Sequence, residues 1–218
     1  MNKTLKNTLM VAAALLPVAW LAFIFPDVPE VVPTHFGVDG PDAWGNKREL
    51  FVFSGILAAV SIGVYFLLQN IHRLDPKRAH KDTSATFGKM AVGTVIFIAV
   101  LNFICLGMSA RNMHLEPVMM SLIGLMFAFL GNIMHNIKPN YFAGIRIPWT
   151  LSSDENWRLT HRLASKIWVA GGLLLALIAL TCPVPVTAVA MPVLLGIMVV
   201  IPIAYSFSLY RKGVGRSS

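Results

Sequence analysis

The chain has 218 residues, of which 56% are hydrophobic and only 13% are charged, whereas an ordinary soluble domain has roughly 25% charged residues. The mean hydropathy of +0.68 is also strongly positive. These values exclude a soluble globular domain and indicate an integral membrane protein. The net charge of +8 does not indicate nucleic-acid binding, because the basic residues fall between apolar runs, where orientation in a membrane explains them.

Six apolar runs follow one another along the chain. They cover residues 9–25, 50–71, 87–110, 117–136, 164–181 and 188–210. A transmembrane helix needs roughly 20 apolar residues, so the runs predict an all-α, polytopic bundle of six transmembrane helices. Lys3 and Lys6 precede the first run as in a signal peptide. No convincing small-residue cleavage site follows, so we interpret this run as a retained first helix.

The basic residues predict the orientation of the bundle. Of the 18 Lys and Arg residues, only Lys47, Arg48 and Arg111 fall on one side of the predicted membrane. Basic residues are enriched in cytoplasmic loops. We therefore expect a multi-pass protein of the cell membrane with both termini in the cytoplasm.

The loop over residues 26–48 is predicted to be extracytoplasmic and ordered. Its four prolines exclude a regular helix, and the chain around Asp39-Gly40 suggests two extended segments joined by a turn. Trp44 argues against disorder. Glu30, His35, Asp39 and Asp42 could in principle bind a metal, but their spacing matches no metal motif. We therefore favour a lid over the outer face, and the sequence predicts no metal and no cofactor.

Polar side chains gather at the end of the fourth predicted helix. Asn132, His135 and Asn136 are spaced i, i+3 and i+4, so they share one helical face. This face either reaches the lipid headgroups or forms a polar site between helices. His135 is the one histidine inside a predicted span, which makes it a candidate proton-sensitive group.

A helix is predicted to begin at about Ser153, because Ser152 and Glu155 have the spacing of a capping box. It would continue as an amphipathic, interfacial cytoplasmic helix into the fifth span. One face carries Trp157, His161, Ala164 and Trp168, and the other carries Asp154, Arg158, Arg162 and Lys166. Trp149 and Trp157 would then lie at the headgroup level. Arg146 either binds a partner group at the membrane boundary or extends to water.

The segment GNIMHNIKPNYFAGIRIPWTLSSDENWRLTHR (131–162) resembles the signature of the SdpI family of bacterial membrane proteins. The outer segment VPTHFGVDGPDAWGNK resembles the short domain of unknown function that precedes it in many members. The resemblance rests on these inner residues: Asn132, Asn140, Gly144, Arg146, Pro148, Trp149, Thr150, Leu151, Ser152, Trp157, Thr160, His161 and Arg162. On the outer side it rests on Pro33, His35, Gly37, Asp42 and Trp44.

The resemblance implies a division of the chain into three parts. Residues 1–71 would hold the first two transmembrane helices with the extracytoplasmic loop, and residues 72–86 would form a basic cytoplasmic loop. Residues 87–218 would form the SdpI-like four-helix region, with the signature loop at 131–162. Candidate site residues are, on the inner side, Asn132, His135, Asn136, Asn140, Arg146, Trp149, Thr150, Trp157, Thr160, His161 and Arg162, and, on the outer side, His35, Asp39, Asp42 and Trp44.

The resemblance also implies a function, namely immunity to a small membrane-active peptide toxin. It further implies signalling by holding a helix-turn-helix transcriptional repressor at the membrane. Anionic lipids are expected partners. Direct binding to nucleic acid is not expected, and the oligomeric state stays open. We expect a non-enzymatic protein, because no standard catalytic motif is present.

Two alternatives remain at this point. A transporter or an ion or proton pathway would use His135, Asn132, Asn102 and Arg146, with Pro192 and Pro202 allowing motion. An intramembrane enzyme would use Arg146 and His161 to contact phosphate at the inner surface.

Overall fold

The computed structural model describes residues 2–37, 40–74, 83–140 and 142–214. Six long helices account for most of them, and each is long and apolar enough to cross a membrane. They are α1 (Lys3–Ile24), α2 (Glu49–Leu74), α3 (Thr83–Arg111), α4 (Glu116–Met134), α6 (Asp154–Thr181) and α7 (Val184–Arg211). The predicted six-helix membrane bundle is therefore confirmed.

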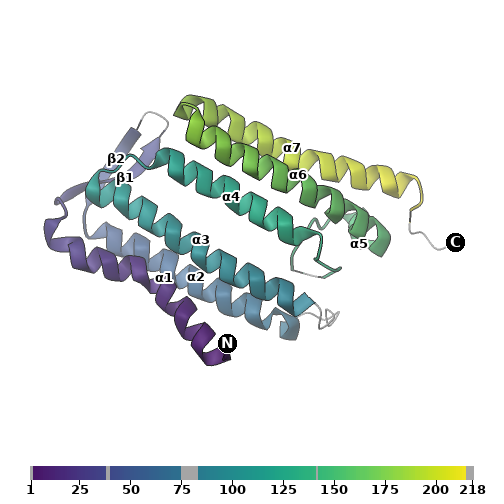
Figure 1. Ribbon diagram of the computed structural model, residues 1–218, viewed down its shortest axis with the longest axis horizontal. Helices are drawn as coiled ribbons and strands as arrows, with labels where there is room; N and C mark the ends of the chain where they lie inside the picture. The colour runs from purple at the N-terminus through teal and green to yellow at the C-terminus, as the bar shows by residue number, and fades with distance from the viewer. Residues whose placement is uncertain (1, 38–39, 75–82, 141, 215–218) are drawn as a thin grey trace.

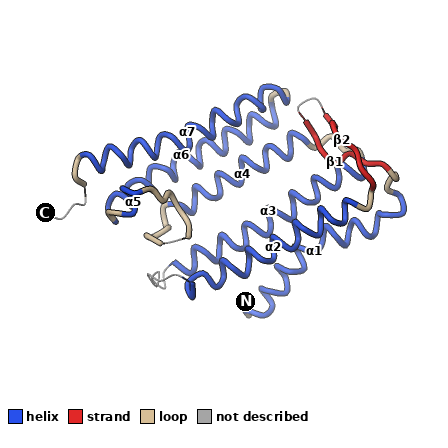
Figure 2. The backbone as a smooth tube through the Cα atoms, turned by 180° about the vertical axis from the view of Figure 1, so that it is seen from behind, coloured by secondary structure: helices blue, strands red, loops and turns tan. Residues whose placement is uncertain are grey.

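The long helices form two groups, which Figures 1 and 2 show from opposite sides. Helices α1, α2 and α3 pack together in one group, and α4, α6 and α7 pack together in the other. The two groups meet where α3 lies beside α4. The β-hairpin lies at one end of the bundle, whereas the first residues of α1, the short helix α5 (Pro148–Leu151) and the last residues of α7 lie toward the opposite end.

The contact between α4 and α6 depends on small residues. A Cβ atom at Gly124 would lie 2.7 Å from the backbone nitrogen of Ala176, and one at Gly172 would lie 2.5 Å from that of Ala128. These residues form a Gly-x-x-x-Ala pair on each helix, which lets the two backbones approach closely. The sequence contains no Gly-x-x-x-Gly pair, so this contact was not predicted.

The loop between α1 and α2 folds into an antiparallel hairpin of β1 (Val31–Gly37) and β2 (Gly40–Asn46), in which Val31 pairs with Asn46 and Gly37 with Gly40. The prediction of two extended segments around a turn is confirmed. The base of the hairpin follows a single 3₁₀ turn, Phe25–Asp27, and packs into the bundle. Val32 is buried in one apolar cluster with Leu21, Leu50 and Leu106, so the hairpin is fixed to α1, α2 and α3.

The predicted interfacial helix is continuous with the fifth span, because both belong to α6. Its predicted start is correct, since Ser153 caps the helix by accepting a hydrogen bond from the backbone N–H of Asn156. The predicted pairing of Ser152 with Glu155 is wrong, because Glu155 pairs with Arg158 at 2.6 Å. The short helix α5 was not predicted.

We expect Gly172→Ala to destabilise the bundle, because the added methyl group would meet the backbone of α4. Overpacking of this kind typically costs about 1–3 kcal/mol. The thermal unfolding of the purified protein in detergent measures the effect. Gly196→Ala on α7 is the matched control, since a Cβ atom there would meet nothing within 4 Å. Equal melting temperatures for the two variants would contradict the close α4–α6 packing.

Candidate functional site

The described residues between α4 and α6, 135–140 and 142–153, form a cap on the ends of these helices. Asn140 fixes the first turn of this cap. The Asn140 side chain accepts hydrogen bonds from the backbone N–H groups of Phe142 and Ala143, both at 2.7 Å. It also donates to the backbone oxygens of Lys138 at 2.8 Å and Ala143 at 3.0 Å. Asn140 is only 3% exposed, and its side chain pairs backbone groups that no helix satisfies.

His161 fixes the next part of the cap. Its Nδ1 lies 2.8 Å from the backbone oxygen of Trp157, which can only accept, so Nδ1 carries the proton. Its Nε2 accepts a hydrogen bond from the N–H of Ile145 at 2.9 Å. The imidazole is therefore neutral and fully hydrogen-bonded, and it joins α6 to the cap across 16 residues.

Trp157 extends this contact to the end of α4. Its indole stacks on the His161 ring with centroids 4.2 Å apart, and Nε1 donates to the backbone oxygen of Ile137 at 2.7 Å. Trp157 is 1% exposed, so its interpretation as a residue at the headgroup level is wrong. Gly144 crosses directly over the two rings with φ of +116°, and a Cβ atom there would lie 2.5 Å from Nε2 of His161.

Thr150 closes the cap at the short helix α5. Its hydroxyl group accepts from the N–H of Ile147 at 3.1 Å and lies 2.8 Å from the backbone oxygen of Ile145. Trp149 packs beside it against α7, with its ring centroid 5.2 Å from that of Phe207. The cap therefore contacts α6 and α7 as well as α4.

A buried polar cluster joins α6 to α7 immediately beyond the cap. Asn156 is 0% exposed; it donates to the backbone oxygen of Ser206 at 3.0 Å and accepts from the Ser206 hydroxyl group at 2.6 Å. Thr160 donates to the same Asn156 oxygen at 3.0 Å. Asn156 and Ser206 were absent from the predicted site. The only signal in the sequence was a polar residue on the buried face of each helix.

The polar face predicted on α4 does not form a buried site. Asn132, His135 and Asn136 are all exposed. Helix α4 ends at Met134, and His135 is its C-cap, so the placement of His135 inside a span is wrong. The histidine that lies within a span-length helix and is buried is His161.

The predicted faces of α6 are confirmed. Trp157, His161 and Ala164 are buried, whereas Asp154, Arg158, Arg162 and Lys166 are exposed. His135, Arg158, Arg162 and Lys166 line a cavity of about 360 Å³ beside the cap. Arg146 is also exposed. Helix α6 therefore presents a basic surface beside the cap.

The residues proposed for a transport pathway are not brought together. Asn102 is buried between α2 and α3, where it donates to the backbone oxygen of Ser54 at 3.2 Å. Asn132 and His135 lie instead on the exposed end of α4. Neither the cavity lined by Asn132 nor the cavity lined by His135 includes Asn102 in its lining.

On the hairpin, His35 and Asp42 form a hydrogen-bonded pair across the two strands. Trp44 is 61% exposed, and Asp39 lies outside the described residues. Within the part of the chain that the structure describes, no three His, Cys, Asp or Glu residues lie close enough to bind a metal.

An apolar groove of about 610 Å³ lies under the hairpin. It connects β1 with the ends of α2, α3 and α4 that lie nearest the hairpin. Its lining includes Phe36 of β1, Phe53 and Ile56 of α2, Cys105 of α3 and Met119 of α4. Glu49 and His35 are polar groups in the same lining.

Comparison with known proteins confirms the predicted resemblance. Residues 136–206 match the SdpI/YfhL protein family, and residues 12–58 match a domain of unknown function, DUF1648. The Immunity protein SdpI of Bacillus subtilis (strain 168) is 24% identical over 208 residues, which is 95% of this chain and 97% of that protein. No solved structure matches the chain. The SdpI family is not an enzyme family, in agreement with the expectation of a non-enzymatic protein.

We expect Gly144→Ala to loosen the cap, because the new methyl group would collide with the His161 ring and the positive φ would strain the backbone. The cost should be about 1–3 kcal/mol. Limited trypsin digestion at Lys138 and Arg146 would then be faster. Gly213→Ala is the matched control, since Gly213 also has a positive φ, of 72°, but open space around it. Equal cleavage rates in both variants would contradict the proposed role of close packing at Gly144.

Proposed function

We propose, from the resemblance to the SdpI/YfhL protein family, that this chain is an integral membrane immunity protein that protects a cell from a small membrane-active peptide toxin. The observation that carries the proposal is the alignment with the Immunity protein SdpI over 95% of this chain. The two matched family regions lie in the order predicted from the sequence. The relation therefore extends over both groups of helices.

We place toxin binding in the groove under the hairpin. A membrane-active peptide presents apolar side chains, and the groove offers an apolar lining with exposed residues Val52 and Ile56 at its edge. Glu49 supplies a negative charge in the same lining, which favours a peptide with a basic residue beside its apolar segment. The ordered hairpin covers one side of this groove, as expected for a lid.

We place the signal that toxin binding sends across the membrane at the basic surface of α6, beside the cap. Arg158, Arg162 and Lys166 are exposed there and suit an acidic surface of a repressor. The toxin can shift the protein between two states only if it binds them with different affinity. In this proposal both termini and the cap face the cytoplasm, and the hairpin faces the outside.

Immunity is tested by expressing the protein in toxin-sensitive bacteria and measuring growth against a purified sporulation-delaying peptide toxin. We expect the unmodified protein to raise the inhibitory concentration. Ile56→Trp should reduce this protection by about tenfold, equivalent to about 1.4 kcal/mol of binding, because the indole would fill the groove. Ile197→Trp, at an exposed position on α7 outside the groove, should leave protection unchanged.

The two parts of this proposal fail in different ways. An unmodified protein that gives no protection would contradict the immunity function itself. Protection that is equal in the Ile56→Trp and Ile197→Trp variants would contradict only the assignment of the groove.

Orientation is tested by labelling single cysteines in intact cells with a membrane-impermeant maleimide. Cys105 and Cys182 are first replaced by serine, since both are free thiols. We expect Trp44→Cys on the hairpin to react from outside, and Lys166→Cys beside the cap to react only after lysis. Labelling of Lys166→Cys in intact cells would contradict the proposed orientation.

A further inference from the structure

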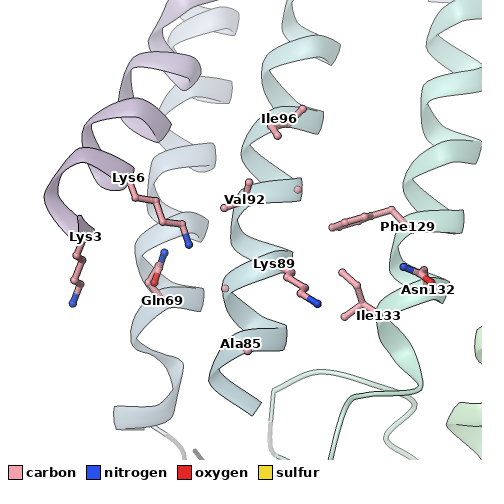
Figure 3. A pocket seen from close by; sticks show the side chains of 12 residues that line it. Lys3, Lys6, Gln69, Ala85, Lys89, Val92, Ile96, Phe129, Asn132 and Ile133 are labelled. Carbon is pink, nitrogen blue, oxygen red and sulfur yellow. The ribbon is translucent and has the colours of Figure 1, made fainter. Parts of the chain in front are cut away.

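A cavity of about 720 Å³ opens between the two groups of helices at the end of the bundle that carries the cap. Figure 3 shows it between α1, α2 and α3 on one side and α4 on the other. The toxin groove lies at the opposite end of the same α3–α4 contact. This cavity is therefore separate from the site proposed for immunity.

Three lysines give the cavity a positive charge. Lys3 and Lys6 belong to α1, and Lys89 belongs to α3. Among the residues that the structure describes, no Asp or Glu contributes to the lining and no ion pair involves these lysines. In Figure 3, Lys6 lies beside Gln69 of α2, and Lys89 points toward Ile133 of α4. The cavity therefore favours an anionic group.

Apolar side chains continue from the lysines toward the middle of the bundle. Val92 and Ile96 follow Lys89 along α3, and Phe129 faces them from α4. Ile96 lies seven residues beyond Lys89, which is about 10 Å along a helix. An anion that bound only to the lysines would leave this apolar surface uncovered. A ligand with a negative head and an apolar chain would cover both.

We propose that this cavity binds an anionic phospholipid, with its phosphate group at the basic end of the cavity and an acyl chain along the apolar surface. Charge complementarity supports the headgroup, since each basic residue near an anionic membrane surface contributes about 1 kcal/mol. The apolar surface supports the chain, because burial of each CH₂ group contributes about 0.8 kcal/mol. Neither term depends on toxin binding.

The position of the cavity gives the lipid a structural role. The ring of Phe129 lies directly against Gly93 of α3, and both residues line the cavity. This contact is part of the boundary between the two groups of helices. A lipid beside it would contact α1, α3 and α4 at once and would hold the two groups together.

Filling the cavity tests the site without any change of charge. A Cβ atom at Gly88 would meet nothing within 4 Å, and Gly88 lines the cavity, so Gly88→Leu places its side chain in this open space. Gly196→Leu is the matched control on α7, where a Cβ atom also meets nothing within 4 Å. The full-length protein is purified, and bound phosphatidylglycerol and phosphatidylcholine are counted by native mass spectrometry.

We expect the unmodified protein and the Gly196→Leu variant to retain phosphatidylglycerol in preference to phosphatidylcholine, and Gly88→Leu to lose most of this preference. Equal retention by the two leucine variants would overturn the proposal. Inorganic phosphate is added in a separate arm. Displacement of phosphatidylglycerol by millimolar phosphate would show a plain anion site and would also overturn the role of the acyl chain.

A second set of variants separates the cavity from general attraction to basic residues. Lys3, Lys6 and Lys89 are replaced together by glutamine, and the control replaces Lys166, Arg211 and Lys212, which are exposed at the same end of the bundle. Affinity for phosphatidylglycerol should fall by about fivefold per lysine in the first variant and much less in the control. An equal fall in both would overturn the assignment to the cavity.

Discussion

The cap between α4 and α6 depends on side chains that satisfy a non-helical backbone at the edge of the membrane. Asn140, Thr150 and His161 hydrogen-bond backbone groups of the cap. They pair the N–H groups of Phe142, Ala143, Ile145 and Ile147 and the carbonyl groups of Lys138, Ala143 and Ile145. Backbone groups left unpaired near hydrocarbon are costly, so irregular chain persists there only when protein groups satisfy it. This requirement accounts for the presence of Asn140, Thr150, Trp157 and His161 in an otherwise apolar chain.

The same hydrogen bonds explain why the candidate site divides into an interior and a surface. Trp157 and His161 use their polar atoms inside the cap, so neither is available to a ligand without breaking a buried contact. The exposed groups include the cations of α6 at positions 158, 162 and 166, and also Arg146, Asn132, His135 and Asn136. The groups open to a ligand at this end are therefore the exposed ones, whereas the buried aromatic and amide side chains hold the cap on the helix ends.

The sequence predicted what depends on local patterns, and it missed what depends on contacts between distant residues. Helix length, the start of α6 and its two faces follow from hydropathy, capping and helical period. The contact of Asn156 with Ser206 joins residues 50 positions apart, and no local pattern indicates it. Trp157 was misplaced for the same reason, because an indole at a helix start suits a headgroup region equally well. Its buried partner, the carbonyl group of Ile137, is 20 residues away.

The contact between α4 and α6, inside one group, differs from the contact between α3 and α4, where the two groups meet. Helices α4 and α6 are joined backbone to backbone through Gly124 and Gly172, so they form one unit. Helices α3 and α4 meet through side chains such as Phe129 against Gly93, and a cavity borders this contact at each end. A ligand in either cavity contacts both sides of the boundary. Two ligands are coupled when each binds one spacing of α3 and α4 more tightly than another spacing. Each ligand then changes the affinity of the other by the same factor.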